Sequence, residues 1–397
     1  MIRPMLLALL LALPAARAGP GLEARVEAGV ERGVAFLLSR YDKSDGWGNA
    51  LGNGVYGGVG KAYPYDAGPT ALVCFALLKA GVEPDHEVLR KAFSFLRVKH
   101  RTPAVAYELS VELLAVLERS GAARGPDFRL AALRGKRSDQ RFKRPVGSPI
   151  ATKHWTWIVD LAGKLIGFQA SNGGWRYYPK DFHSGGRSDV SSTQFALLAL
   201  TTASRAGYDV PREVFQRARD YLIGSQAKSG PEVPRAIHVP GGEADARDRA
   251  RGFPYIADSD VLAYRRISGG MTAAGVASLL LIREELGSDP EVEQAILDGY
   301  AWLGRYFTVK VNPGYAPFLA GSYHYTYLYA LERCGDLGRR EVLGGRSWFA
   351  EGARLLLSRQ REDGAFPDPT CMNPEDVLGT AFALLYLTRA SRPVSGR

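Results

Sequence analysis

A short polar run, Asp189-Val190-Ser191-Ser192-Thr193, stands directly before an apolar stretch that continues to residue 200. A carboxyl group there can act as an acid or base, or it can accept hydrogen bonds from the free N–H groups of a helix start. Two other groups share this setting. His324 lies between two tyrosines, and Asp376 precedes the apolar run 377–387. Asp189, His324 and Asp376 are therefore the candidate catalytic residues.

Polar side chains stand before several other apolar runs as well. If these runs are helices packed in parallel, their first residues meet at one end of the bundle and line a ligand-binding cavity. The expected set is Tyr65, Asp66, Thr70, Asp189, Ser191, Thr193, Tyr323, His324, Tyr325 and Thr380. Helix capping is the competing interpretation, because Ser, Thr and Asp are preferred N-cap residues and Ser191 with Gln194 fits a capping box.

The elements that carry these residues form a repeat of two alternating segments. The first type is a helix rich in small apolar residues, at 70–81, 104–121, 193–207, 271–282, 324–335 and 380–387. The second type has an apolar pair near its end, at 33–48, 87–98, 161–175, 218–230, 292–307 and 353–366. Apolar residues recur every three or four positions, which predicts an all-α chain of about six inner and six outer helices.

Paired helices with one apolar face bury it by stacking on their neighbours. Six pairs that close on themselves would form an (α/α)6 toroid, and an open superhelix is the alternative. The segment 228–267 is rich in Pro, Gly and charge and is predicted to be an insertion. Its Asp258 and Asp260 form a weak Mg²⁺-binding pattern, since one D-x-D pair supplies few oxygen ligands.

Several outer segments end in a turn with a recurring composition. Gln169 is followed by Gly173, Gly174 and Trp175, and Gln360 is followed by Gly364 and Phe366. A glutamine there can satisfy carbonyls left free at a helix end, and glycine permits the positive φ of a tight reversal. These turns resemble the Gln-Trp repeats of squalene–hopene cyclases and of the β subunits of protein prenyltransferases. The resemblance implies an α/α toroid with a central apolar cavity.

The chemistry implied by those families is not matched by the residues of this chain. The cyclases carry a D-x-D-D-T acid motif, where this chain has Ser191 and Ser192 in place of the central carboxyls. The prenyltransferases hold zinc through Asp, Cys and a His in a setting like that of His324, but the other ligands are missing here. We therefore predict no metal and no cofactor. If the chain is an enzyme of these families, the proton donor is another carboxyl, for which the candidates are Glu108, Asp160, Asp189 and Asp376.

The first residues of the chain predict that it is exported from the cytoplasm. Residues 1–18 read as a secretory signal peptide with a short apolar core, which leaves 19–397 as a single toroid domain exported to the periplasm, cell envelope or medium. The net charge of +10 is partly concentrated at 124–145, where the options are a solvated loop and contact with an anionic membrane. No nucleic-acid motif accompanies it. Cys74, Cys334 and Cys371 show no metal spacing, and their disulfide state is open.

The expectation that follows is a binding protein without catalysis. Its cavity would hold an apolar, isoprenoid-like molecule or a protein segment. A terpene-cyclase- or prenyltransferase-like enzyme with non-standard catalytic residues is the alternative. A hydrolase or lyase of envelope glycans ranks third, because (α/α)6 toroids also perform that chemistry but the Gln-Gly-Trp turn is not expected in them.

Overall fold

The computed structural model describes residues 21–42, 46–47, 67–99, 105–121, 143–145, 147–177, 187–239, 245–314, 323–368 and 376–391. The inner helices are α2 (Ala67–Lys79), α4 (Ala106–Arg119), α7 (Val190–Arg205), α9 (Gly269–Leu286), α11 (His324–Leu337) and α13 (Val377–Leu387). The outer helices are α1 (Leu22–Ser39), α3 (Glu87–Lys99), α6 (Thr152–Gly167), α8 (Arg212–Ser225), α10 (Pro290–Arg305) and α12 (Trp348–Arg359). The predicted alternation of two helix types is confirmed.

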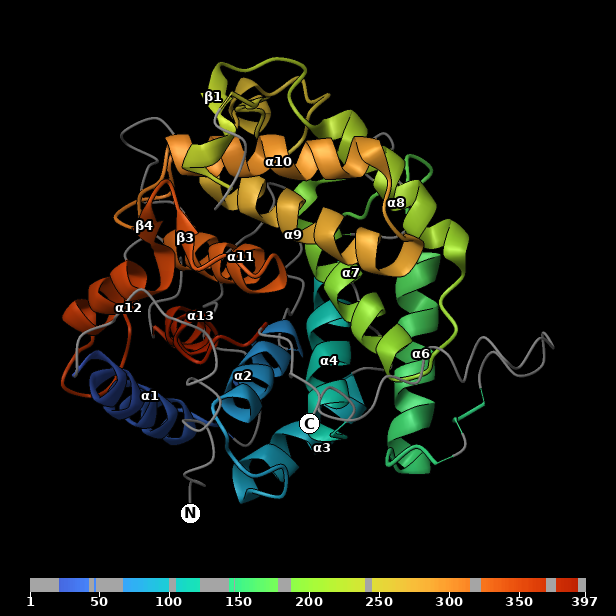
Figure 1. Ribbon diagram of the computed structural model, residues 1–397. Coiled ribbons are helices and arrows are strands. Elements are labelled where there is room, and N and C mark those ends of the chain that lie inside the picture. The colour runs from blue at the N-terminus through green and yellow to red at the C-terminus, as the bar shows by residue number, and fades with distance from the viewer. Residues whose placement is uncertain are drawn as a thin grey trace.

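The inner helices form a closed ring (Figure 1). Each contacts the next along the chain, from α2 to α4, α7, α9, α11 and α13, and α13 contacts α2. The outer helices pack outside this ring, each against one or two inner helices. The fold is therefore the (α/α)6 toroid, and the open superhelix is wrong.

Residue type explains which helices lie inside. Helix α13 reads VLGTAFALLYL, and ten of its eleven residues are buried. Helix α8 reads REVFQRARDYLIGS and buries Val214, Phe215, Ala218 and Leu222, which recur at helical spacing on one face. A helix that is apolar all round needs neighbours on every side, and only the inner ring provides them.

The glutamine turns join one outer helix to the next. Gln169 Nε2 donates to the carbonyls of Gly173 (2.8 Å) and Val214 (2.9 Å), so that the end of α6 is bonded to α8. Gln360 Nε2 donates in the same way to Gly364 (3.0 Å) and to Gly29 (2.8 Å) of α1. This second turn connects the last outer helix to the first and so helps close the ring.

Glycine is required in these turns because the backbone of the next outer helix lies too close for a Cβ atom. Gly173 has φ 92°, and a Cβ there would collide with the backbone carbonyl of Arg217 on α8. Gly364 has φ 92° as well, and a Cβ there would collide with the carbonyl of Arg32 on α1. At both positions the backbone is left-handed, which favours glycine. The atoms that a Cβ would meet belong to a helix backbone, which cannot move aside as a flexible side chain can.

The predicted insertion is present and contains its own small structure. Strands β1 (Glu232–Pro234) and β2 (Arg247–Arg249) pair antiparallel, followed by the short 3₁₀ helix η5 (Leu262–Arg265). A 3₁₀ turn, η4 (Arg235–Ile237), follows β1, and β3 (Val342–Leu343) pairs with β4 (Arg346–Ser347) before α12. Gln226 still bonds across the insertion, to the carbonyls of Arg251 and Ala295, so the outer-helix connection is kept.

Within the described ranges, no helix is long and apolar enough to cross a membrane. Cys74 and Cys334 are buried free thiols. The predicted signal peptide, Cys371 and most of the basic stretch 124–145 lie outside the described residues.

Candidate functional site

The first residues of the inner helices meet at one end of the toroid, which we call the mouth. Hydrogen bonds connect them around the ring. The N–H groups of Ala106, Val190 and Gly269 donate to the carbonyls of Tyr177, Tyr255 and Pro313, which precede the next inner helix in each case. Gly68 N–H likewise reaches Glu108 Oε1 (3.2 Å), and Tyr325 N–H reaches Asp368 Oδ2 (3.1 Å). The sequence expectation that these helix starts share one end of the bundle is therefore met.

Threonines in the first turns hold the preceding segments in place. Thr193 Oγ1 accepts from Trp175 N–H (3.0 Å) and donates to the carbonyl of Asp189 (2.7 Å). Three other threonines accept a hydrogen bond from a backbone N–H in the same way. These are Thr70 from Trp47, Thr272 from Phe253 and Thr380 from Phe366. Thr70, Thr193 and Thr380 are completely buried in this arrangement. Of the expected cavity residues, these three are thus engaged in holding the repeat together.

Asp189 begins α7 as its N-cap. Its Oδ1 accepts from Ser192 N–H (2.6 Å), and its Oδ2 accepts from Ser192 Oγ (3.1 Å). The cap is therefore Asp189 and not Ser191, which lies half-buried in the first turn. Burial raises the pKa of Asp189 to about 6, although hydrogen bonds from Ser192 and Tyr255 oppose the rise. The side chain has no exposed surface.

His324 is buried at the start of α11 and uses both ring nitrogens. Arg359 Nη1 lies 3.1 Å from Nδ1, and a guanidinium can only donate, so Nδ1 is the acceptor. Nε2 then carries the proton and donates to the carbonyl of Val309 (2.8 Å). Burial, together with the charge of Arg359, lowers the pKa of His324. The ring is a neutral structural group in this arrangement.

Asp376, by contrast, precedes α13 without capping it. Its backbone is left-handed, with φ 56°, and no side-chain bond reaches the first turn of the helix. Its Oδ2 lies 2.7 Å from Arg361 Nη1, and the side chain keeps some exposure. Burial and the neighbouring carboxylates of Asp363 and Asp368 raise the pKa of Asp376 against the opposing charge of Arg361.

Tyr323, which precedes α11, has the same backbone strain. Its φ is also 56°, and its side chain is 53% exposed. A left-handed backbone is mild for Asp but unusual for a bulky aromatic residue, and such positions cluster at functional sites. Neighbouring helices α11 and α13 therefore each begin with a strained candidate residue, and buried Asp368 lies near both Tyr325 and Asp376.

The centre of the ring is filled by aromatic rings around one buried cation. Arg333 on α11 stacks 4.0 Å from the ring centre of Tyr329 and 5.0 Å from that of Phe195. Its Nη2 donates to Gln194 Oε1, whereas its Nη1 and the Nε2 of Gln194 find no partner in the described part of the chain. A buried guanidinium and an amide with spare donors favour a polar ligand or water over a hydrocarbon.

The remaining candidates are dispersed. Asp160 is exposed on outer helix α6 and pairs with Lys164 (2.9 Å), while Glu108 is buried at the mouth beside Gly68. Asp258 and Asp260 are exposed on the insertion, and Asp260 pairs with Arg187 (2.7 Å). Tyr65 and Asp66 lie outside the described residues. No group of three or more potential metal ligands occurs in the described ranges.

Sequence reasoning missed three residues of the mouth and the ring centre. Arg333 and Arg359 lie within helices, where charged residues ordinarily face solvent. Asp368 follows Phe366 by two positions, and Tyr177 follows Trp175 at the same offset. Aligning the turns would have marked the position two residues after the aromatic residue as a recurring one, which is the signal that could have found Asp368.

No protein-family model matches the sequence, and no curated protein matches it. Among solved structures, the inactive α-1,6-mannanase of glycoside hydrolase family 76 from Salegentibacter sp. HEL1_6 matches in two variants. The complex with α-1,6-mannotriose has a TM-score of 0.53 at 11% identity, covering 92% of this chain and 100% of that chain. The complex with α-1,6-mannotetrose has a TM-score of 0.52 at 11% identity, covering 92% and 99%. A D-mannose isomerase matches with a TM-score of 0.48 at 12% identity, covering 93% and 99%.

These matches correct the family expected from the sequence. The similar structures are (α/α)6 toroids of a family different from squalene–hopene cyclases and prenyltransferases, so that assignment was wrong. The physical reason is that the glutamine bonds carbonyls left free at the end of a helix, and every stacked helix pair has such carbonyls. The turn therefore indicates the fold and does not indicate which reaction the protein performs.

The expected function and ligand are corrected with it. An apolar, isoprenoid-like ligand and a non-catalytic or terpene-type role do not agree with structural neighbours that bind mannan oligosaccharides. The centre of the ring agrees with this correction, because Arg333 and Gln194 stand where the expectation placed an apolar cavity.

Proposed function

We propose that this protein is a glycoside hydrolase that takes a sugar chain at the mouth of the toroid. The single observation that carries the proposal is Asp376, a partly buried carboxyl whose pKa is raised by burial and by the nearby carboxylates of Asp363 and Asp368. Glycoside hydrolysis commonly uses two carboxyl groups, one kept protonated as the general acid and one ionised. The likeness to the mannanases supports the fold on which this chemistry would be built.

Each residue of the cluster has a role in this proposal. Asp376 donates the proton of one carboxyl oxygen to the leaving glycosidic oxygen as the bond to the anomeric carbon breaks, and water supplies the hydroxyl group that this carbon gains. Arg361 Nη1 orients the carboxyl by donating to Oδ2 (2.7 Å). Asp368, oriented by the N–H of Tyr325, is the second carboxyl group of the pair. Exposed Tyr323 offers an aromatic face and a hydroxyl to the sugar. Neutral His324 fixes Arg359 beside α11 and takes no part in proton transfer.

We also propose that the protein acts outside the cytoplasm. The signal peptide predicted at residues 1–18 supports export, and the substrate would then be a glycan of the envelope or the surroundings.

The test is glycan cleavage by the protein without its signal sequence. We would incubate it with α-1,6-mannan oligosaccharides and a panel of bacterial and fungal glycans and measure reducing-sugar release. Asp376→Asn should lower the rate by about 10²–10⁴-fold, because the general acid is removed while its shape is kept. The matched control is Asp160→Asn on the outer wall, which should keep the wild-type rate. Release from no glycan in the panel, or full activity of Asp376→Asn, would contradict the proposal.

A further inference from the structure

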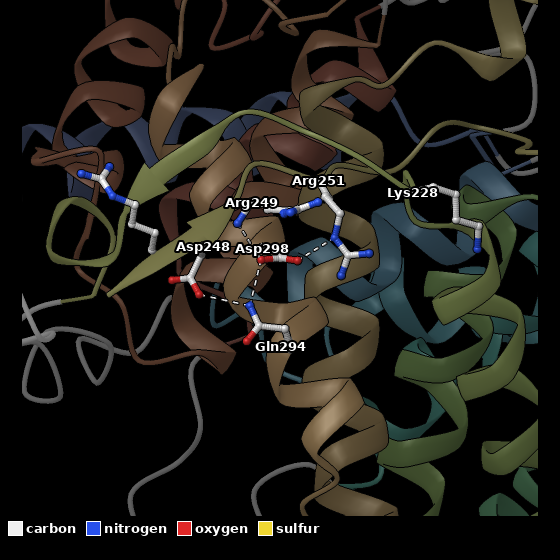
Figure 2. Close-up of a pocket in the computed structure, with 7 residues that line it drawn as sticks. Lys228, Asp248, Arg249, Arg251, Gln294 and Asp298 are labelled. Atoms are coloured by element: carbon white, nitrogen blue, oxygen red, sulfur yellow. Dashed lines mark hydrogen bonds and ion pairs between the residues drawn. The ribbon is translucent and has the colours of Figure 1, made fainter. Parts of the chain in front are cut away.

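The insertion forms a basic pocket on the outer wall, away from the inner-helix starts. The pocket has a volume of about 340 Å³ and lies between the end of α8, strand β2 and helix α10. Its lining residues are Lys228, Arg247, Asp248, Arg249, Arg251, Gln294 and Asp298. Figure 2 shows Gln294 between the two carboxylates, with Arg251 directed at Asp298. Four cationic residues and two carboxylates therefore line the pocket.

Both carboxylate oxygens of Asp248 already have hydrogen-bond partners within the protein. Its side chain is fully buried, and both oxygens accept from Arg235 (2.6 and 2.9 Å), with further contacts to Gln294 and His238. Burial alone would raise the pKa of Asp248, but the hydrogen bonds from Arg235, Gln294 and His238 outweigh it and lower the pKa. The charge of Asp248 is thus compensated by Arg235, which does not line the pocket.

Asp298 is held by the backbone and by only one end of a guanidinium. Its Oδ1 accepts from the N–H of Arg249 (2.9 Å) and from Gln294 (2.9 Å), and its Oδ2 accepts from Arg251 Nε (2.6 Å). The contact with Arg249 uses only its backbone. The terminal nitrogens of Arg251 remain as donors at the pocket, and the exposed side chain of Arg249, another lining residue, makes no hydrogen bond to the described residues.

The other cations are also exposed there. Arg247 and Arg249 are two residues apart on β2 and project to the same face, and both are exposed. Glu232 stands opposite Arg249 in the hairpin, but no ion pair joins these two side chains. Lys228 Nζ has one contact, with the carbonyl of Gly224 (3.3 Å), which leaves further donor capacity.

We propose that this pocket binds a tetrahedral oxyanion, a phosphate or sulfate group, either free or as an ester on a sugar. Arginine forks and a lysine that approach from separate segments match an anion with several oxygens. Asp298 holds Arg251 in place and compensates its charge, whereas no ion pair among the described residues joins Lys228, Arg247 or Arg249 to a carboxylate of the pocket. This site goes beyond the proposed hydrolysis and does not depend on it, because none of its residues lies at the mouth.

The test is calorimetric titration of the protein with inorganic phosphate at constant ionic strength, balanced with sodium chloride. The double variant Lys228→Gln/Arg249→Gln removes two cations whose side chains make little other contact, the 3.3 Å bond from Lys228 Nζ to the carbonyl of Gly224 in α8 being the exception among the described residues. It should bind phosphate at least about 10-fold more weakly, since a hydrogen bond to a charged group contributes about 1.5–3 kcal/mol and 1.4 kcal/mol is tenfold. Arg265→Gln, an exposed arginine of the same insertion outside the pocket, is the matched control and should bind as the wild type does.

Mannose 6-phosphate and mannose separate the two sources of the anion. Binding of the phosphate ester that the double variant loses, with none for mannose, supports a sugar ester as ligand. Binding of inorganic phosphate alone supports the free anion. The proposal is overturned if phosphate gives no saturable heat beyond that of chloride, or if the double variant binds it as tightly as the wild type.

Discussion

Two sides of the mouth use the same residue at the same repeat position for different purposes. Asp189 and Asp376 each precede an inner helix, and each has its carbonyl bonded to a threonine four residues later. Asp189 is extended, with φ −126° and ψ 151°, so its side chain turns onto the helix start and caps it. Asp376 is left-handed, so its carboxyl leaves the helix and reaches Arg361. The backbone conformation of one residue thus separates a structural carboxyl from a candidate catalytic one.

Both sides share a buried aromatic residue in the turn before the inner helix, and removing it should lower the free energy of unfolding equally on each side. Trp175 and Phe366 are completely buried, and each donates its N–H to an inner-helix threonine. Trp175→Ala and Phe366→Ala should each destabilise the protein by about 3–5 kcal/mol through lost packing. Denaturant unfolding of both variants measures this. A cost confined to one of the two would show that the sides are not built alike.

The ionisation of Asp189 should affect stability, with a sign that follows from its burial. Its pKa is about 6 in the folded protein and near 3.8 when unfolded, so the native state binds more protons between these values. Stability therefore falls as pH rises from about 4 to 6, and a cost of about 3 kcal/mol is fully present at pH 7.

Asp189→Asn keeps the cap but cannot ionise. Relative to the wild type, it should gain about 2–2.5 kcal/mol between pH 4 and pH 7, measured by urea unfolding at each pH. If the stability difference between the variant and the wild type is the same at both pH values, the pKa of Asp189 is the same in the folded and unfolded states, and the prediction is wrong.

The anchoring hydroxyls should each contribute a smaller, similar amount. Thr193→Val and Thr380→Val keep the shape but leave the N–H of Trp175 or Phe366 buried without an acceptor. We expect a loss of about 1–3 kcal/mol for each variant in thermal or denaturant unfolding. Thr202→Val, a half-buried threonine on α7 that bonds only within its helix, is the control and should cost less.

The smallest expected effect concerns strain on the Asp376 side. Tyr323→Gly relieves a left-handed backbone that costs about 1–2 kcal/mol, minus about 0.5–1 kcal/mol for the greater freedom of glycine when unfolded. The variant should be as stable as the wild type or slightly more stable. Ala151→Gly, at an exposed residue before α6 with φ −62°, should instead lose stability. If both changes cost the same, the strain at Tyr323 is not real.

Periodicity made the architecture predictable from the sequence. The alternation of small apolar and amphipathic segments, and the Gln169 and Gln360 turns, depend on interactions between residues close in the chain or one repeat apart. The ligand was predicted wrongly, because it rested on those turns and on the expectation of an apolar centre. Arg333 reverses that expectation by pairing with Gln194, which is 139 residues away.

The sequence alone determined that helix pairs alternate, that threonines and aspartates begin the inner helices, and that glycine-bearing turns end several outer ones, because capping, periodicity and turn chemistry are local. The tertiary structure alone decided which aspartate caps and which is turned away, since that depends on the contacts that hold Asp376 at positive φ. It also brought the carboxylate of Asp368 close enough to raise the pKa of Asp376, and it assembled the basic pocket from the insertion and α10. Such proximities arise only when the ring closes, and no spacing along the chain records them.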